Sequence, residues 1–197
     1  MGKALTTEKG SAMKFAAAVI LMLAALISDV SASERTLGVK VAVDKEYREH
    51  LPFRGDWEAH IRTAFEVASR EFRRQFGGEI VITEITEWRP LELKSLPELL
   101  VDLRSRFWGI GIDFVIGFTG KTADYNGMAY QNHYFAAIST IAAPGTPYTL
   151  LHEIGHLCGA DHVDGPSIMS DDIKFMHQTF NFDAANAEKV RNGKCLH

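Results

Sequence analysis

The sequence predicts an α/β (α+β) domain built on a mixed, mainly parallel five-stranded sheet. Short β-branched or apolar runs alternate with helical patterns in the order strand, helix, strand, helix, strand. This alternation favours parallel strands joined by right-handed crossovers. Two further strand-like runs follow and complete the five. The chain of 197 residues, 46% hydrophobic and 23% charged, is long and apolar enough for one domain with a sizeable core.

The first half of the chain supplies two strands and the long helix between them. The run TLGVKVAV, at residues 36–43, alternates and is rich in β-branched side chains, which indicates a strand. Asp56 stands at the N-cap of an amphipathic helix that Gly77 ends. We expect this helix to back the sheet and His60 to lie on its surface side. The run EIVITEITEW, at residues 79–88, predicts the second strand.

A second backing helix and three strands are expected next. The helix covers residues 95–107, and Pro97 suits its first turn. The run IDFVIGF, at residues 112–118, is short and largely apolar, as is typical of a buried strand. The segments GMAYQN, at residues 127–132, and FAAISTI, at residues 135–141, predict the last two strands.

The most informative stretch is LLHEIGHLCGADH, which contains the pattern HExxHxxGxxH formed by His152, Glu153, His156, Gly159 and His162. Residues four apart share one face of a helix, so His152 and His156 can both reach one metal ion. Glycine adopts positive φ readily, and a turn at Gly159 would bring His162 back as a third ligand. Three histidines leave a position open for water, which marks a catalytic zinc site. Glu153 would miss the metal but reach that water as a general base.

This motif resembles the zinc-binding signature of the metzincin metalloproteases. That clan also has a tight turn, the Met-turn, with a methionine beneath the metal. The sequence SIMS begins five residues after His162, so the resemblance implies that Met169 forms the floor of the site. In astacin-like and serralysin-like members a tyrosine two residues beyond this methionine adds a metal ligand, and here that position is Asp171. The sequence is therefore more similar to the adamalysin, matrixin and archaemetzincin types.

The resemblance implies a metzincin-like catalytic domain at residues 33–197, with two backing helices, an active-site helix, a Met-turn and a C-terminal helix. It implies an endopeptidase with one catalytic Zn²⁺ ion and a peptide or protein substrate bound in extended form. By the same resemblance, Gly127, Met128 and Ala129 belong to the edge strand that pairs with the substrate, main chain to main chain.

Four other interpretations of the HExxHxxGxxH pattern are alternatives to a catalytic zinc site in a general endopeptidase. A helix can carry two solvated histidines by chance, but glycine and histidine at the two further offsets argue against it. In the gluzincin arrangement a distant glutamate is the third ligand; Glu188 is the candidate, but His162 fits the spacing better. A non-catalytic zinc-containing module could capture peptides or proteins without cutting them, although it would not need Glu153. A protease with a single endogenous protein target would appear inert on generic substrates.

The rest of the C-terminal third contains fewer signals. The active-site helix is expected to begin at Pro147 or Thr149. Residues 171–181 are expected to be irregular, and a last helix is expected at residues 184–191. Three aromatic side chains are expected to pack under the site: Phe175, Phe180 and Phe182.

The N-terminus predicts a secretory signal peptide, residues 1–32. Three lysines precede an apolar run at residues 15–27, and the small residues of VSA end the segment. The run is shorter than the roughly 20 residues of a typical membrane span, and an uncleaved signal anchor is the alternative. Few residues separate the cleavage site from the first strand, so no inhibitory propeptide is expected. We expect a secreted protein, extracellular or periplasmic.

The two cysteines of the chain, Cys158 and Cys195, could form a disulfide in an exported protein. Such a bridge would tie the active-site helix to the C-terminus. Cys158 lies two residues after His156, about 200° round a helix, so it would face away from the metal. A buried thiol is the alternative.

Charge and composition limit which classes of binding partner the sequence is compatible with. The formal net charge is −4, and no basic stripe with interleaved aromatic residues is present, so we expect no nucleic-acid partner. No cysteine stands directly after the apolar run, so a lipoprotein anchor is not supported. We expect no stable membrane anchor. We expect a monomer.

Overall fold

The computed structural model describes residues 35–50, 55–92, 95–107, 111–121 and 125–197. All of them lie within one compact unit, Glu34–His197. The expected signal peptide lies outside the described residues. Within the described ranges, no helix is both long and apolar enough to cross a membrane.

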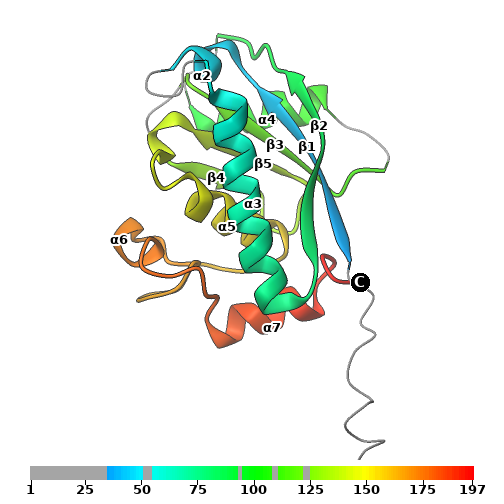
Figure 1. Cartoon of the computed structure of the whole chain (residues 1–197), viewed down its shortest axis with the longest axis vertical. Coiled ribbons are helices and arrows are strands. Elements are labelled where there is room, and N and C mark those ends of the chain that lie inside the picture. Colours follow the sequence, from blue (N-terminus) through cyan, green and yellow to red (C-terminus); the bar gives the residue numbers. More distant parts are fainter. Residues whose placement is uncertain (1–34, 51–54, 93–94, 108–110, 122–124) are drawn as a thin grey trace, which may run out of the picture. The chain divides into compact units, whose positions relative to one another are not determined.

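A five-stranded sheet with the strand order β2-β1-β3-β5-β4 forms the centre of the fold (Figure 1). Its strands are β1 (Thr36–Val43), β2 (Glu79–Glu87), β3 (Phe114–Thr119), β4 (Gly127–Ala129) and β5 (Phe135–Ser139). β1, β2, β3 and β5 pair in parallel, whereas β4, at one edge, is antiparallel to β5. The expected mixed, mainly parallel sheet is confirmed.

The last two strands are shorter than the sequence predicts. β4 ends at Ala129 because the chain turns toward β5 and Asn132 adopts the left-handed conformation, with φ 57°. β5 ends at Ser139, whose side chain accepts a hydrogen bond from the Ile141 N–H. That bond begins the 3-10 helix η1 (Thr140–Ala142) and turns the chain toward the next helix.

Helices cover both faces of the sheet. α3 (Trp57–Phe76) and α5 (Thr146–Leu157) lie on one face and α4 (Leu96–Arg106) on the other, while the short α2 (Lys45–Glu49) follows β1 (Figure 1). Side chains alternate along each strand, so each face has its own apolar core. The core beneath α3 and α5 includes Leu37, Val39, Val41, Ile116 and Ile138. The core beneath α4 includes Ala42, Trp88, Leu99, Val115 and Ala137.

α3 is the long helix that the apolar spacing predicts. Asp56 occupies the N-cap position without a side-chain capping bond, and Gly77 ends the helix with φ 78° and an N–H that donates to Arg73 O at 2.8 Å. The expectation that His60 is a surface residue is wrong. His60 is half-buried, and its Nε2 lies 3.1 Å from Oγ1 of Thr146 at the start of α5.

The segment after residue 170 has more regular structure than expected. A short helix, α6 (Ile173–Met176), forms because the Asp172 side chain accepts a hydrogen bond from the Lys174 N–H at 2.8 Å. Phe175 does not pack inward as expected and is 37% exposed, because it points away from the core face that Met176 fills. Phe182, by contrast, is 8% exposed and belongs to the core.

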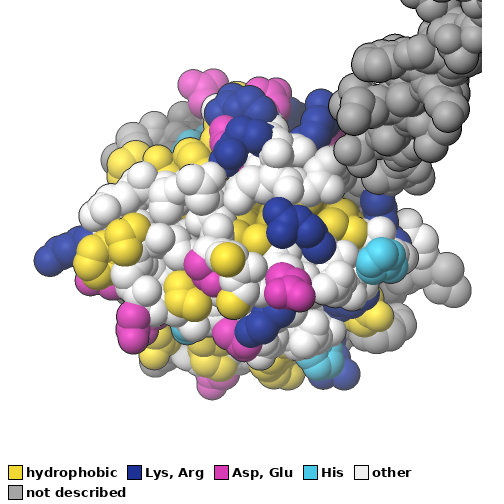
Figure 2. Space-filling model, turned by 90° about the horizontal axis from the view of Figure 1, so that it is seen from below, with side chains coloured by type: hydrophobic (Ala, Val, Ile, Leu, Met, Phe, Trp, Pro, Cys, Tyr) yellow, Lys and Arg dark blue, Asp and Glu magenta, His cyan; other side chains and the backbone are white. Residues whose placement is uncertain are grey.

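The last helix, α7 (Ala184–Asn192), begins at Asp183, whose side chain accepts a hydrogen bond from the Asn186 N–H. Figure 1 shows α7 at the end of α3 that leads into β2. Figure 2 views the molecule from that end and shows acidic and basic side chains interspersed over this face. The C-terminal helix therefore forms part of this charged face of the fold.

Candidate metal centre and active site

α5 presents three of the motif residues from a single helix. Pro147 lies in its first turn, where a missing N–H is tolerated, and apolar side chains anchor the helix on the core. His152 and Glu153 are 5% and 3% exposed, and His156, one turn later, is half-buried. The rings of His152 and His156 lie edge to face, with centroids 4.6 Å apart. The helix thus positions two imidazoles and one carboxyl group by its own geometry.

A glycine turn brings the chain back toward the exposed end of this helix. Gly159 has φ 96°, a conformation that is strained for other residues. The Ala160 N–H donates to Gly155 O at 2.9 Å, and the Gly159 N–H donates to His156 O at 3.0 Å, so the last carbonyls of the helix are satisfied. His162, an exposed residue of the following loop, then reaches the two helical histidines.

The three imidazoles converge on one point. Nε2 of His156 lies 3.1 Å from Nε2 of His152 and 3.0 Å from Nε2 of His162, and the third side of the triangle is 3.2 Å. Nitrogen ligands about 2.0–2.1 Å from a tetrahedral zinc ion are roughly 3.3–3.4 Å apart, so a small outward shift suits zinc. The donor set, three nitrogens with one face open, fits a catalytic zinc site.

Hydrogen bonds at the other ring nitrogen fix the tautomers of the helical histidines. Nδ1 of His152 lies 2.7 Å from Ile168 O, and Nδ1 of His156 lies 2.8 Å from Ala160 O. A carbonyl oxygen only accepts, so each Nδ1 carries the proton and each Nε2 keeps its lone pair. Burial, together with the neighbouring His156, lowers the pKa of His152 to about 3, and burial also lowers the pKa of His156. Both rings are therefore neutral at pH 7, which is the form in which an imidazole can bind a metal ion.

Glu153 is a buried carboxyl group beside these rings. Its Oε2 has no hydrogen-bond partner among the described residues. Its Oε1 lies against β4, where a Cβ added to Gly127 would come within 2.6 Å of it. Burial raises the pKa of Glu153 to about 8. A cation held by the histidines would lower this pKa, because a nearby opposite charge favours the ionised form.

Met169 lies beneath α5 and is fully buried. A Cβ on Gly155 would come within 2.5 Å of the Met169 sulfur, so the methionine packs against the backbone of the helix between the two histidines. Met169 O also accepts the Val163 N–H at 3.1 Å. The turn that contains Met169 therefore contacts both the helix and the loop that carry the histidines.

Two cavities meet at the histidines, and His152, Glu153 and His162 line both of them. The larger, of about 600 Å³, extends to Ile173 and Met176 of α6. The smaller, of about 380 Å³, follows β4 and is also lined by Met128, Ala129, Gln131 and Asp161. The open face of the histidine triangle is therefore reached from a cleft with an arm on either side.

β4 forms one wall of this cleft. In the described sheet it is the edge strand and pairs with β5. Gly127, Met128 and Ala129, the residues expected to meet a substrate, are all half-buried and line the smaller cavity. The structure thus places them beside Glu153 with one edge of the strand unpaired in the sheet.

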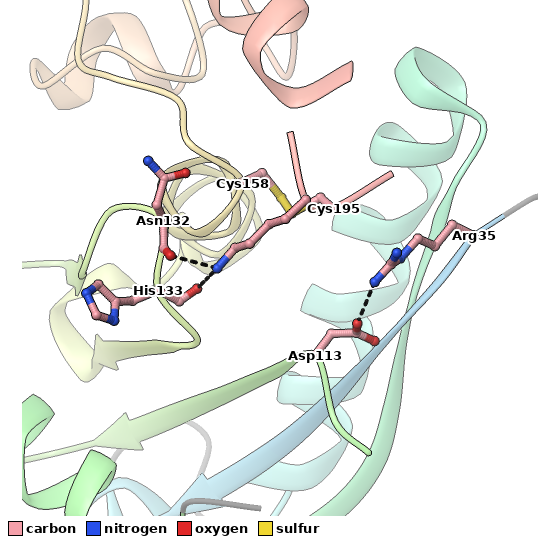
Figure 3. The surroundings of a disulfide bond; sticks show 7 residues. Arg35, Asp113, Asn132, His133, Cys158 and Cys195 are labelled. Carbon is pink, nitrogen blue, oxygen red and sulfur yellow. Dashed lines mark hydrogen bonds and ion pairs between the residues drawn. A yellow bond between two sulfur atoms is a disulfide. The ribbon is translucent and has the colours of Figure 1, made fainter. Parts of the chain in front are cut away.

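A disulfide between Cys158 and Cys195 joins the end of α5 to the C-terminal tail (Figure 3). Both residues are 1% exposed. In the tail, Nζ of Lys194 donates to Asn132 O at 2.8 Å and to His133 O at 2.6 Å. Figure 3 marks these bonds as the dashed lines that end at Asn132 and His133. The tail thus supports both the active-site helix and the turn between β4 and β5.

Sequence reasoning did not identify three residues of this region. Thr149 is 1% exposed and lines the larger cavity, and its Oγ1 has no hydrogen-bond partner in the part of the chain that the structure describes. It lies four residues before Glu153, so helical spacing was a usable signal. Tyr125 lines both cavities, and Asn186 binds the loop of His162 through Asp161. No motif marks either of these two.

The fold and the three-histidine cluster together define the class of the protein, a metallopeptidase. Residues 33–178 match a family model described as metallo-peptidase family M12. The chain belongs to this family, whose members use zinc, and the described structure offers three histidines to hold the ion.

No curated protein matches the chain. A solved structure titled "Structure of a chaperone-substrate complex" is similar, with a TM-score of 0.56 and 13% sequence identity over 71% of this chain. This chain spans 28% of the length of that one, and the likeness concerns the fold alone.

Proposed function

We propose that the protein is a secreted, monomeric zinc endopeptidase of metzincin type. His152, His156 and His162 hold the metal, and Glu153 is the general base. The observation that carries this proposal is the convergence of three Nε2 atoms, 3.0–3.2 Å apart, next to a buried carboxyl group. Asp171 lines the larger cavity and is not part of the three-histidine cluster. This supports the adamalysin, matrixin or archaemetzincin types over the astacin type.

The protein's own groups prepare the site for hydrolysis. When bound, zinc supplies Lewis-acid chemistry, which polarises a peptide carbonyl and acidifies water. The Nδ1–H bonds to Ile168 and Ala160 hold two imidazoles with Nε2 directed to the site. Glu153 accepts a proton from the attacking water at Oε2, the oxygen to which no described residue is hydrogen-bonded, and later donates it to the leaving amine.

The cleft suits an extended peptide. The unpaired edge of β4 offers main-chain groups of Gly127, Met128 and Ala129 to a substrate strand. The larger cavity, walled by Ile173 and Met176, accepts a substrate side chain on one side of the bond that is cut.

Secretion is the part of the proposal that depends on residues 1–32. Their basic, apolar and small-residue segments have the order of a signal peptide. The Cys158–Cys195 disulfide is consistent with an oxidising compartment. Sequencing the N-terminus of the protein recovered from the medium or periplasm tests this, and a mature protein that begins at Met1 would contradict cleavage.

Cleavage of an unstructured peptide library tests the catalytic proposal. Glu153→Gln should lower kcat/KM by about 10²- to 10⁴-fold, because general base catalysis contributes that much. Zinc should still bind, because the three imidazoles are unchanged. Glu66→Gln, an exposed change on α3, is the matched control and should cleave as the parent does.

The outcomes separate the alternatives. Cleavage that is lost on chelation and in Glu153→Gln supports a zinc endopeptidase. One zinc ion per chain without cleavage of any peptide favours a binding module or a protease with a single target. A parent that binds no zinc contradicts the proposal.

A further inference from the structure

His162 is held differently from the other two histidines. It lies in an exposed loop, so no helix fixes its position. Its two chain neighbours, however, are each bound to another part of the fold. The Val163 N–H donates to Met169 O at 3.1 Å, and Asp161 is bound through its main chain by the side chain of Asn186.

The carboxamide of Asn186 pairs with both main-chain groups of Asp161. Its Oδ1 accepts the Asp161 N–H at 2.9 Å, and its Nδ2 donates to Asp161 O at 2.9 Å. Asn186 is 1% exposed, so water does not compete for these bonds. Two parallel hydrogen bonds to one residue fix both the position and the direction of the chain just before His162.

A neighbouring carboxylate fixes the orientation of this carboxamide. Nδ2 also donates to Oδ2 of Asp183 at 2.8 Å. Because a carboxylate only accepts, the amide nitrogen must face Asp183, which leaves Oδ1 for the Asp161 N–H. The two hydrogens of Nδ2 are therefore used by Asp183 and by the Asp161 carbonyl.

The same carboxylate reaches the turn beneath the helix. Oδ2 of Asp183 accepts a hydrogen bond from Oγ of Ser167 at 3.1 Å, and that Oγ accepts the Met169 N–H at 3.1 Å. Ser167 and Met169 are both buried. A continuous set of hydrogen bonds thus runs from the Met169 turn, through Asp183 and Asn186, to the residue that precedes His162.

We propose that Asn186 is a positioning residue for the metal centre, which holds the loop of His162 in its metal-binding arrangement before zinc arrives. This inference rests on the proposed zinc function. Without the carboxamide, the loop must lose conformational freedom when it binds the metal, and part of the binding free energy offsets that loss. Changes to groups that orient metal ligands typically weaken metal binding by about 10- to 100-fold.

Zinc affinity of the full chain, measured by competition with a chromophoric chelator, tests this role. Asn186→Ala removes the whole carboxamide, and Asn186→Asp keeps its shape but removes both Nδ2 donor bonds and adds a charge beside Asp183. Both should raise the zinc dissociation constant by about 10- to 100-fold. In the zinc-free protein, amide exchange of residues 160–163 should become faster in both variants.

A matched control separates positioning from general stability. Asp102 is buried on the opposite face of the sheet, where its carboxylate accepts the Trp88 Nε1–H at 2.9 Å. Asp102→Ala should lower stability, because it leaves that donor without its partner, yet it should leave zinc affinity unchanged. If one Asn186 variant fails to fold, the other carries the comparison with Asp102→Ala.

Two results would overturn the inference in different ways. If the parent binds zinc and both Asn186 variants bind it equally well, Asn186 is merely a structural residue of α7, and the proposed function stands. If the parent itself binds no zinc, the proposed function fails, and the inference fails with it.

Discussion

His152 and His156 are presented by one helix, whereas His162 comes from a loop beyond it. The helical pair needs only the geometry of α5 and two carbonyl acceptors for its Nδ1–H groups. The loop histidine depends on contacts with the Met169 turn and with α7, which follow it in the chain. Two of the three clustered histidines are therefore placed by one local element, whereas the position of the third depends on the C-terminal segment.

Loss of a proposed zinc ligand should give the largest effect, and it tests whether the helical histidine and the loop histidine contribute equally to zinc affinity. His152→Ala and His162→Ala should each weaken zinc binding on the order of 1,000-fold, since each removes about a third of the protein's contribution to a binding free energy of about 10–16 kcal/mol. Competition with a chelator measures both. His133→Ala, an exposed histidine outside the cluster, is the control.

The two variants, His152→Ala and His162→Ala, should differ in the zinc affinity that remains. His162→Ala leaves the helical pair intact, with Nε2 atoms 3.1 Å apart, so its residual affinity should be the higher. Unchanged zinc affinity in His162→Ala would show that the loop histidine is not a ligand. It would instead favour a distant glutamate, Glu188, as the third ligand.

Reduction of the disulfide should act mainly on stability. The double variant Cys158→Ser/Cys195→Ser opens a bridge between residues 37 apart, and the loop-closure term predicts a loss of about 4 kcal/mol in the free energy of unfolding. Denaturant unfolding of the zinc-free protein measures it. Zinc affinity should fall less than in Asn186→Ala, because the side chain of Asn186, and not the bridge, is hydrogen-bonded to the residue before His162. The opposite order would mean that the tail, and not Asn186, holds the loop.

Features that depend on residues close together in the chain are the ones that the sequence predicts well. The first strand was expected at residues 36–43, and β1 has these bounds because alternation in a buried strand depends on its own residues. The helical spacing likewise predicted that His152 and His156 share a face. The stop of the long helix at Gly77 follows from the same local logic, since glycine adopts the left-handed conformation there.

What sequence could not predict depends on partners far along the chain. Asn186 is 25 residues from Asp161, and an asparagine near the start of a helix looks like any capping residue. His60 was expected at the surface because only its position on α3 was visible, and its contact with Thr146 of α5 was not. Phe175 was expected inside because apolar residues usually are, but the short α6 turns it outward.

The smallest expected effect is on the pH dependence of stability, and it concerns Asp44, a buried residue at the end of β1 that does not belong to the three-histidine cluster. Burial raises the pKa of Asp44 above its ordinary value of 3.8, although the Tyr47 N–H, the Gly120 N–H and the Thr119 hydroxyl donate to it. The folded state therefore holds this proton more tightly than the unfolded state does. The stability that this group contributes is full below pH 3.8 and is lost as the pH rises through the folded-state pKa.

Asp44→Asn should remove this dependence. The stability of the parent relative to the variant should decline between pH 3.8 and neutrality, as measured by denaturant unfolding of the zinc-free protein at several pH values. Stability conferred by zinc should change in the opposite direction, because protons compete with the metal for imidazole at low pH. A parent and variant whose stabilities stay parallel across this range would show that Asp44 titrates normally. The two effects can therefore be told apart, because stability from the buried Asp44 proton falls with rising pH, whereas stability from zinc bound by the three histidines rises.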